Sequence, residues 1–210
     1  MVGVETKGKR QRSDKKRDVK PTILVVLKDA VYRLSYITKT SVKDVVEQMI
    51  IHSINSRKIV DDLSKYFRRQ IHMNDTIFRG NIGMPRIAKR EEGEREQVTT
   101  RLKQRDYEIV SALAYALDVS PTRVCAILLD AAMRDFHFIN SYVRKYLTTE
   151  LTPGQLNELQ KILLFVNNDD EIEEKLSLAD LLSLIVNEVS TPITKLKDTV
   201  NDFIIKNWRD

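Results

Sequence analysis

Three polar side chains in the segment from Gln97 to Leu102 are best suited to specific recognition chemistry. Gln97, Thr99 and Arg101 alternate there with more apolar residues. Alternation of this kind puts successive side chains on opposite faces of a β-strand, so the three polar groups share one face. Only this face is polar and long enough to reach the edges of nucleic-acid bases. The alternative is an ordinary hairpin edge whose polar face meets solvent.

The residues after this strand predict two helices that would hold it in place. We expect the first helix from Lys103 to Leu117 and the second from Pro121 to about Asp135. Between them, Asp118 tolerates the left-handed backbone that a tight turn needs. Ser120 suits the cap of the second helix, and Pro121 suits its first position. The order is therefore strand, helix, helix.

Over about 38 residues this region resembles the ribbon-helix-helix family of DNA-binding proteins, the Arc and CopG type. The resemblance rests on register, because Ser120 follows Leu102 by eighteen residues, where the family caps its second helix. Asp118 stands where the family usually has glycine. The resemblance implies a mainly α fold of tandem ribbon-helix-helix units with short strands, plus a helical C-terminal region. It also implies that two antiparallel strands enter the major groove of double-stranded DNA.

The resemblance assigns roles to two groups of residues. In the major groove, Arg101 would pair with guanine, Gln97 with adenine, and Thr99 with a base edge or a thymine methyl group. A second group would contact phosphates and position the protein without reading sequence, through side chains or through the amides at the start of the second helix. Its members are Lys103, Arg105, Ser120, Thr122 and Arg123.

An earlier segment, residues 21–55, predicts a degenerate copy of the same unit. We expect a β-branched strand over residues 22–27 and helices over residues 29–37 and 41–54. Alignment of Leu27 with Leu102 puts Thr22, Leu24 and Val26 on the face that should read bases. Ser41 then follows Leu27 by only fourteen residues, one helical turn too soon. This copy is therefore expected to serve pairing or packing, with base reading left to the unit at residues 96–140.

A single strand of this kind needs a partner, since a lone strand pair is only marginally stable. The two copies could pair within one chain, or each could pair with its twin in a second chain. A homodimer is the favoured prediction, because the Gln/Thr/Arg strand matches its own antiparallel copy.

Charge divides the chain into a basic front and an acidic rear. Residues 1–149 hold 29 Lys and Arg against 18 Asp and Glu, a net charge of +11, whereas residues 150–210 hold 6 against 12. Residues 1–20 read as a disordered basic arm that tracks phosphates, or as a solubilising tail. Residues 56–95 read as a helix and connector. Residues 141–210 read as an acidic helical region that binds a protein partner, with a capping box at Thr152 to Gln155 and a degenerate third copy near Ser177.

Enzymatic, metal and membrane roles find little support in the sequence. His52, His72 and His137 stand apart from one another and from Cys125, and no glycine-rich phosphate loop follows a strand. We therefore expect no catalytic residue, no metal site and no cofactor. A lone cysteine and the lack of a long apolar run favour a cytoplasmic protein rather than a membrane protein. The resemblance implies that this protein is of bacterial type and nucleoid-associated.

The resemblance implies a transcriptional repressor or a plasmid or phage replicon regulator. Two alternatives stay open. One is an antitoxin whose C-terminal helices, residues 152–208, bind a toxin. The other is a scaffold whose repeats serve only oligomerisation.

Overall fold

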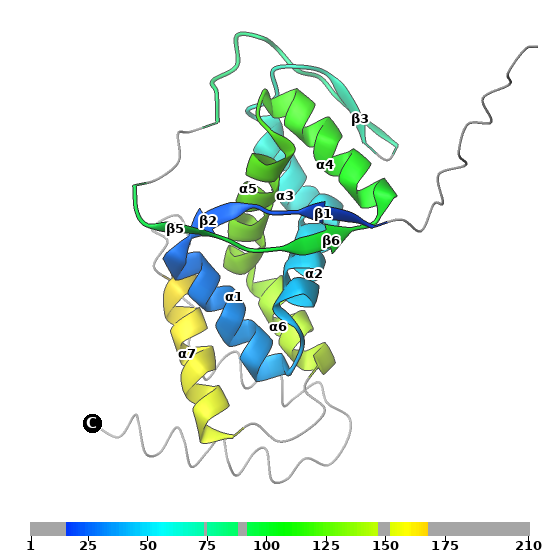
Figure 1. Ribbon diagram of the computed structural model, residues 1–210. Helices are drawn as coiled ribbons and strands as arrows, with labels where there is room; N and C mark the ends of the chain where they lie inside the picture. Colours follow the sequence, from blue (N-terminus) through cyan, green and yellow to red (C-terminus); the bar gives the residue numbers. More distant parts are fainter. Residues whose placement is uncertain (1–15, 74, 88–91, 147–151, 168–210) are drawn as a thin grey trace, which may run out of the picture.

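The computed structural model describes residues 16–73, 75–87, 92–146 and 152–167, and it is mainly helical with short antiparallel strand pairs (Figure 1). The elements in chain order are β1 (Arg17–Val19), β2 (Thr22–Leu24), α1 (Val25–Thr38), α2 (Val42–Asn55), α3 (Arg57–Ser64), β3 (Ile71–Met73), β4 (Thr76–Phe78), β5 (Arg95–Gln97), β6 (Thr100–Leu102), α4 (Gln104–Leu117), α5 (Pro121–Arg134), α6 (Phe136–Tyr146) and α7 (Pro153–Asn167).

The order of strand, helix and helix occurs twice, and the two copies have the same spacing. α4 starts 79 residues after α1, and α5 starts 79 residues after α2; all four helices have 14 residues. The turns also correspond, since Lys39 and Asp118 both adopt the left-handed conformation, with φ of 53° and 59°. Ser41 and Ser120 cap the second helices through their side chains. The expected helices at residues 103–117 and 121–135, and the left-handed Asp118, are confirmed.

The two copies contribute one strand segment each to a continuous two-stranded antiparallel ribbon. β1 pairs with β6, with Arg17 opposite Leu102, and β2 pairs with β5, with Thr22 opposite Gln97. Between the two ladders the amide of Val98 donates to the carbonyl of Pro21 at 3.0 Å. The strand that was expected to pair with its twin in a second chain therefore has its partner in the same chain. Pairing within one chain is favoured because the linked strand is present at a high effective concentration.

The first strand lies earlier in the chain than the sequence predicted. Residues 22–27 were expected to form it, but the ribbon covers residues 17–24 and α1 already begins at Val25. The amide of Val25 donates to the carbonyl of Glu94, which closes the ribbon at this end. The β-branched run misled the prediction, because Leu27, Val31 and Leu34 recur at helical spacing and are buried as one helix face.

This shift corrects the alignment of the two copies. With an offset of 79 residues, Ile23 is equivalent to Leu102, and both side chains are buried. Ser41 follows Ile23 by eighteen residues, as Ser120 follows Leu102. The first copy therefore keeps the full spacing, and the missing helical turn came from aligning Leu27. The position of the first strand also corrects the predicted extent of the basic arm, since residues 17–20 belong to the ribbon. Residues 1–15 lie outside the described residues.

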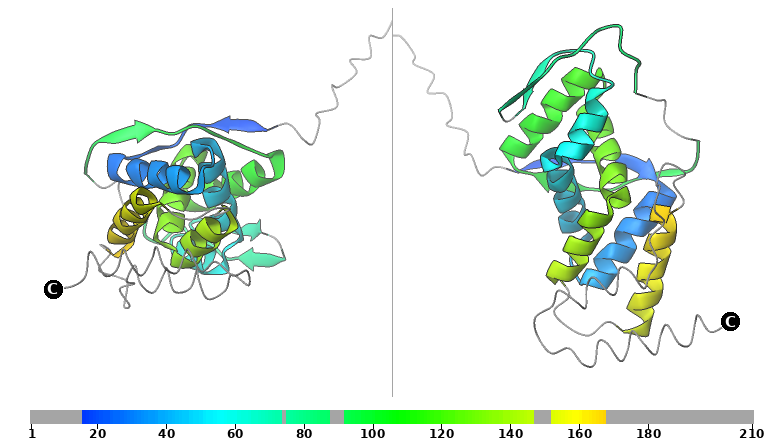
Figure 2. Two further views of the ribbon diagram at one scale, coloured as in Figure 1. Left: turned by 90° about the horizontal axis from the view of Figure 1, so that it is seen from below. Right: turned by 180° about the vertical axis from the view of Figure 1, so that it is seen from behind.

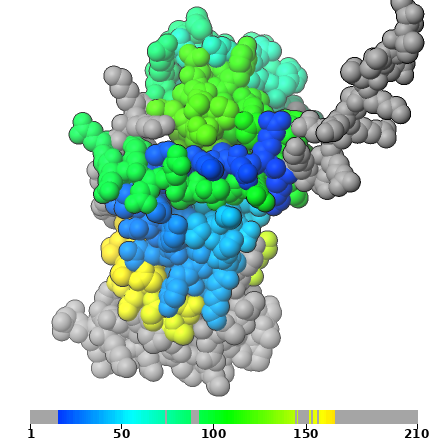
Figure 3. All heavy atoms as spheres, in the orientation of Figure 1, coloured from blue at the N-terminus to red at the C-terminus, as the bar shows by residue number. Residues whose placement is uncertain are grey.

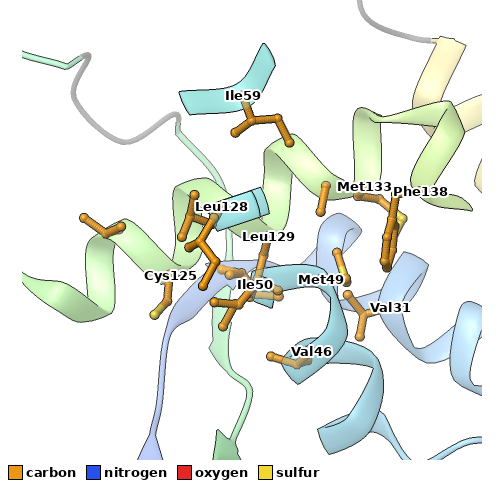
Figure 4. Close-up of a cluster of buried hydrophobic side chains, with 14 of the residues drawn as sticks. Val31, Val46, Met49, Ile50, Ile59, Cys125, Leu128, Leu129, Met133 and Phe138 are labelled. Atoms are coloured by element: carbon orange, nitrogen blue, oxygen red, sulfur yellow. The ribbon is translucent and has the colours of Figure 1, made fainter. Parts of the chain in front are cut away.

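The core lies where the two second helices cross behind the ribbon (Figure 4). Val46, Met49 and Ile50 of α2 meet Leu128 and Leu129 of α5, and all five are fully buried. The hydroxyl of Ser53 donates to the carbonyl of Leu128 at 2.8 Å, which satisfies a polar group inside this contact. Neither copy could bury its apolar helix face without the other, so they fold as one body.

Further elements cover the first helix of each copy. Near α4 lies the β3–β4 hairpin, and the amide of Arg68, just before the hairpin, donates to the carbonyl of Ala116 at 2.7 Å; α3 contacts α2. The hairpin lies within residues 56–95, which were expected to form only a helix and a connector. Near α1 lie α6 and α7, and the buried amide of Gln155 donates to the carbonyl of Ile37 at 3.0 Å. α6 runs across residue 140, where the sequence placed a boundary.

The acidic C-terminal region is described only in part. The expected capping box is confirmed, because Gln155 donates its amide to the Thr152 hydroxyl at 3.3 Å and its side-chain oxygen accepts from the Thr152 amide at 2.9 Å. The predicted third copy near Ser177 lies outside the described residues. In the part of the chain that is described, no single helix is long and apolar enough to cross a membrane; α4 and α5, which meet at 99°, reach that length and hydropathy only as a pair.

Candidate nucleic-acid interface

One face of the ribbon is apolar and packs on the helices. Its side chains come from both strands and are almost fully buried: Val19, Pro21, Ile23, Val98, Thr100 and Leu102. The one hydroxyl among them is satisfied, since Thr100 Oγ1 donates to the carbonyl of Lys43 at 2.8 Å. This hydrogen bond fixes the ribbon to the first turn of α2, so the other face must point away from the helices.

The outer face carries three cross-strand pairs of polar side chains. Asp18 lies opposite Arg101 and Thr22 lies opposite Gln97. At the centre, the same register sets Lys20 opposite Thr99. Asp18, Lys20, Gln97 and Arg101 are exposed, whereas Thr22 and Thr99 are half-buried. The ribbon runs as a strip across one face of the molecule (Figure 3) and forms its outermost layer on that side (Figure 2).

We call these six residues the outer face. The structure brings together all three side chains that the sequence assigned to base reading: Gln97, Thr99 and Arg101. Thr22 lies on the outer face, as predicted for the first copy. The other two residues predicted to lie there, Leu24 and Val26, do not. Leu24 is half-buried at the end of β2, and Val26 belongs to α1 with 59% of its surface exposed. Their places on the outer face are taken by Asp18 and Lys20.

Asp18 and Arg101 form an ion pair across the ribbon. Nε of Arg101 donates to a carboxylate oxygen of Asp18 at 2.7 Å, and the two side chains keep 64% and 58% of their surface exposed. The contact uses Nε, so the terminal nitrogens of the guanidinium can still donate in parallel to a planar acceptor. The pair therefore restrains Arg101 while most of its side chain stays exposed.

Equivalent contacts fasten the two far ends of the ribbon. The guanidinium of Arg17 lies over the ring of Tyr107, 4.9 Å from its centroid. At the equivalent positions of the other copy, Glu96 forms an ion pair with Lys28, and its hydrogen bond and charge raise the lysine pKa. The same positions therefore use different chemistry to join each strand to the first helix of the opposite copy.

The predicted phosphate-contacting residues flank the second copy. Lys103 and Arg105 are exposed at the start of α4. Ser120 and Thr122 are exposed at the start of α5, where the amide of Arg123 donates to the Ser120 hydroxyl at 3.3 Å. Arg123, the fifth predicted phosphate-contacting residue, is half-buried. The equivalent residues of the first copy are Leu24, Val26, Ser41, Lys43 and Asp44, so cations are concentrated on the second copy.

The chain matches no family model, no curated protein and no solved structure. Among the described residues, no group of three His, Cys, Asp or Glu side chains gathers as metal ligands would.

Sequence reasoning missed Asp18 and Lys20 because the run of charges before Pro21 looked like part of a basic arm. A signal was present nevertheless. Asp18, Lys20 and Thr22 alternate with Val19, Pro21 and Ile23, as Gln97, Thr99 and Arg101 alternate with Val98, Thr100 and Leu102. The common spacing of eighteen residues from Ile23 to Ser41 and from Leu102 to Ser120 sets the two alternations in the same register.

Proposed function

We propose that this chain binds double-stranded DNA sequence-specifically, by inserting the two-stranded ribbon into the major groove, and that it acts as a transcriptional repressor or replicon regulator of the ribbon-helix-helix type. The observation that carries the proposal is the outer face. It gathers side chains from both strands that can hydrogen-bond base edges, on a ribbon whose other face is fixed to the core.

The dimensions and chemistry of the ribbon support this role. The major groove is about 12 Å wide and admits a two-stranded ribbon. Arg101 and Lys20 match guanine O6 and N7, Gln97 matches adenine N6 and N7, and Asp18 can accept from the amino group of cytosine. A ribbon that served only to cover the core would not need donors and acceptors of this kind in cross-strand register.

The flanking residues support the same orientation. When the ribbon faces a groove, the phosphates on either side approach the ends of the strands and the starts of the following helices. Lys103 and Arg105 supply cations there, and Ser41 and Ser120 mark two helix N-termini whose dipoles favour an anion. These contacts would position the protein, and the outer face would specify the sequence.

The test is selection of bound duplexes from a random library, followed by binding measurements with Arg101→Ala. A bidentate guanine contact is worth about 1–3 kcal/mol, so the variant should bind the selected site roughly 5- to 150-fold more weakly and lose preference at one position. Because Arg101 is exposed, the melting temperature of the Arg101→Ala protein should match that of the parent.

Arg57→Ala is the matched control. It removes one arginine from α3, outside the ribbon. The side chain of Arg57 is 89% exposed. It should retain the full preference for the selected site. An Arg101→Ala protein with unchanged preference, or a parent that binds random and selected duplexes equally, would refute the proposal.

A further inference from the structure

The two strands of the ribbon differ in sequence, and this determines the kind of site it can read. In an assembly of two identical strands, a two-fold axis makes the two ends of the ribbon alike, and such a ribbon reads a palindrome. Here the equivalent positions hold Asp18 and Gln97, Lys20 and Thr99, and Thr22 and Arg101. All three positions on the outer face differ, so the pseudo-two-fold arrangement of the backbone does not extend to its surface.

The two ends of the outer face consequently differ in charge. One end holds the ion pair of Asp18 and Arg101. The other end holds Thr22 opposite Gln97, both uncharged. Lys20 lies at the centre on one strand only, opposite Thr99.

Each end has its own base preference. At the charged end, Arg101 donates to guanine while Asp18 accepts from the amino group of cytosine, so both favour G·C pairs. At the uncharged end, Gln97 favours adenine and Thr22 can contact a thymine methyl group, so both favour A·T pairs. The two ends lie four residues apart along each strand, about 13 Å, which is about four base pairs at 3.4 Å each.

The positions that flank the ribbon carry the same asymmetry. Lys103 and Arg105 are cations beside the second copy, whereas the equivalent residues of the first copy are Leu24 and Val26. These cations would position the protein on the duplex, but the sugar-phosphate backbone is equivalent in either direction. The direction of binding is therefore set by the base contacts of the outer face.

We infer that one chain, acting alone, reads a short non-palindromic DNA sequence in a fixed direction, with G·C pairs under Asp18 and Arg101 and A·T pairs under Thr22 and Gln97. This inference rests on the proposed function. It replaces the palindromic half-site expected of a homodimer with a directional site.

The first experiment selects duplexes with the full chain and measures stoichiometry on the shortest selected site by native mass spectrometry. We expect a non-palindromic core of about four to five base pairs bound by one chain. Palindromes built from either half of that core should bind about tenfold or more weakly, because one end of the ribbon then meets the wrong bases. A palindromic core, or two chains on one core, would overturn the inference while leaving sequence-specific binding intact.

Two sets of substitutions make the outer face symmetric. Asp18→Gln with Lys20→Thr and Thr22→Arg gives the first strand the outer residues of the second. The reciprocal set, Gln97→Asp with Thr99→Lys and Arg101→Thr, does the opposite. These positions are on the outer face rather than in the core, and the two sets are independent, so the test survives if one set does not fold.

Selection repeated with either set should return a palindromic core. A core as asymmetric as that of the parent would show that direction comes from elsewhere and would overturn the inference. If the parent binds selected and random duplexes with the same Kd, the proposed function fails and this inference fails with it. The two failures are thus distinguishable.

Discussion

The ion pair of Asp18 and Arg101 shows how one residue on the outer face depends on another. Both side chains are well exposed, and exposed ion pairs contribute at most about 1 kcal/mol to stability. The contribution of Asp18 is therefore orientation rather than stability. In the proposed complex a carboxylate would repel phosphates, so Asp18 would suit the floor of the groove, where a cytosine amino group can meet it, and not the rim.

Cys125 illustrates the opposite case, a chemically capable group made inert by its position. It lies fully buried on α5, and burial raises the pKa of its thiol to about 12. Because the thiolate is the reactive form, the native protein should react with a disulfide reagent at pH 8 at least about a hundredfold more slowly than a free thiol. In urea the reaction should be complete and fast. Rapid labelling of the folded protein would contradict the burial.

Asp135, at the end of α5, links stability to pH. Burial opposes its ionisation, but the hydrogen bond from His52 at 2.7 Å, the charge of His52 and the amide of His137 together lower its pKa. A carboxyl whose pKa is lower in the folded state adds stability above its unfolded pKa, near 3.9, and loses it as the pH falls. The free energy of unfolding should thus decrease in acid.

Asp135→Asn isolates this contribution, because other carboxyl groups titrate in the same range. The variant should be roughly 1 kcal/mol less stable at pH 7, and the difference should shrink as the pH falls through the lowered pKa of Asp135. Urea unfolding at several pH values measures this. A constant difference between parent and variant at all pH values would show that the ionised carboxylate contributes nothing.

At the scale of elements, the two helix–helix turns are a natural matched pair. Lys39 and Asp118 hold the same left-handed conformation, which is less costly for aspartate than for lysine. Asp118 also contacts Arg69 at 2.8 Å and lies within 4.0 Å of Arg68 and Arg86. In the second turn, the contacts of Asp118 with these arginines therefore offset part of the backbone strain.

Glycine substitutions should separate these two turns. Lys39→Gly should raise the free energy of unfolding by about 1 kcal/mol, because glycine adopts a positive φ without strain. Asp118→Gly should gain less, because aspartate already tolerates this conformation better than lysine does. Lys39→Ala keeps the strain while removing the side chain, so it should not stabilise. Equal gains at both turns in thermal melts would refute this account.

At the scale of the whole molecule, the ribbon joins the two copies through residues far apart in sequence. β1 pairs with β6 across more than 80 residues, and α2 packs on α5 behind them. Each copy thus supplies half of the ribbon and one of the two helices that cross behind it. This explains why charged residues near the N-terminus are part of the fold.

Two truncations follow from this arrangement. Deletion of residues 1–20 removes β1, exposes the edge of β6 and should destabilise the protein strongly. Deletion of residues 1–15 leaves the ribbon intact and removes Lys7, Lys9, Arg10, Arg12 and Lys15. If these residues contact phosphates, the second truncation should weaken binding to specific and random DNA alike, with a loss of about 0.9 per contact from the slope of log K against log salt.

Thermal melts and salt titrations of both truncated proteins provide the measurement. A protein without residues 1–20 that melts with the parent would contradict the ribbon pairing. Identical salt slopes for the parent and the protein without residues 1–15 would show that these residues only aid solubility.

The sequence by itself determined the features that depend on neighbouring residues. Ser120 and Pro121 predicted a helix start, Asp118 a left-handed turn, and Thr152 with Gln155 a capping box, because caps and turns are built from side chains a few positions apart. The alternation at Gln97, Thr99 and Arg101 gave one half of the outer face for the same reason.

Only the tertiary structure decided which strand lies opposite Arg101, because cross-strand hydrogen bonds join residues that no local pattern connects. The sequence predicted a strand at residues 22–27, whereas the ribbon covers residues 17–24, and a shift in register changes which side chains face outward. The helices resolved the choice: Leu27, Val31 and Leu34 bury more apolar surface as a helix face than as a strand. Asp18 and Lys20 thereby moved from a supposed arm to the outer face.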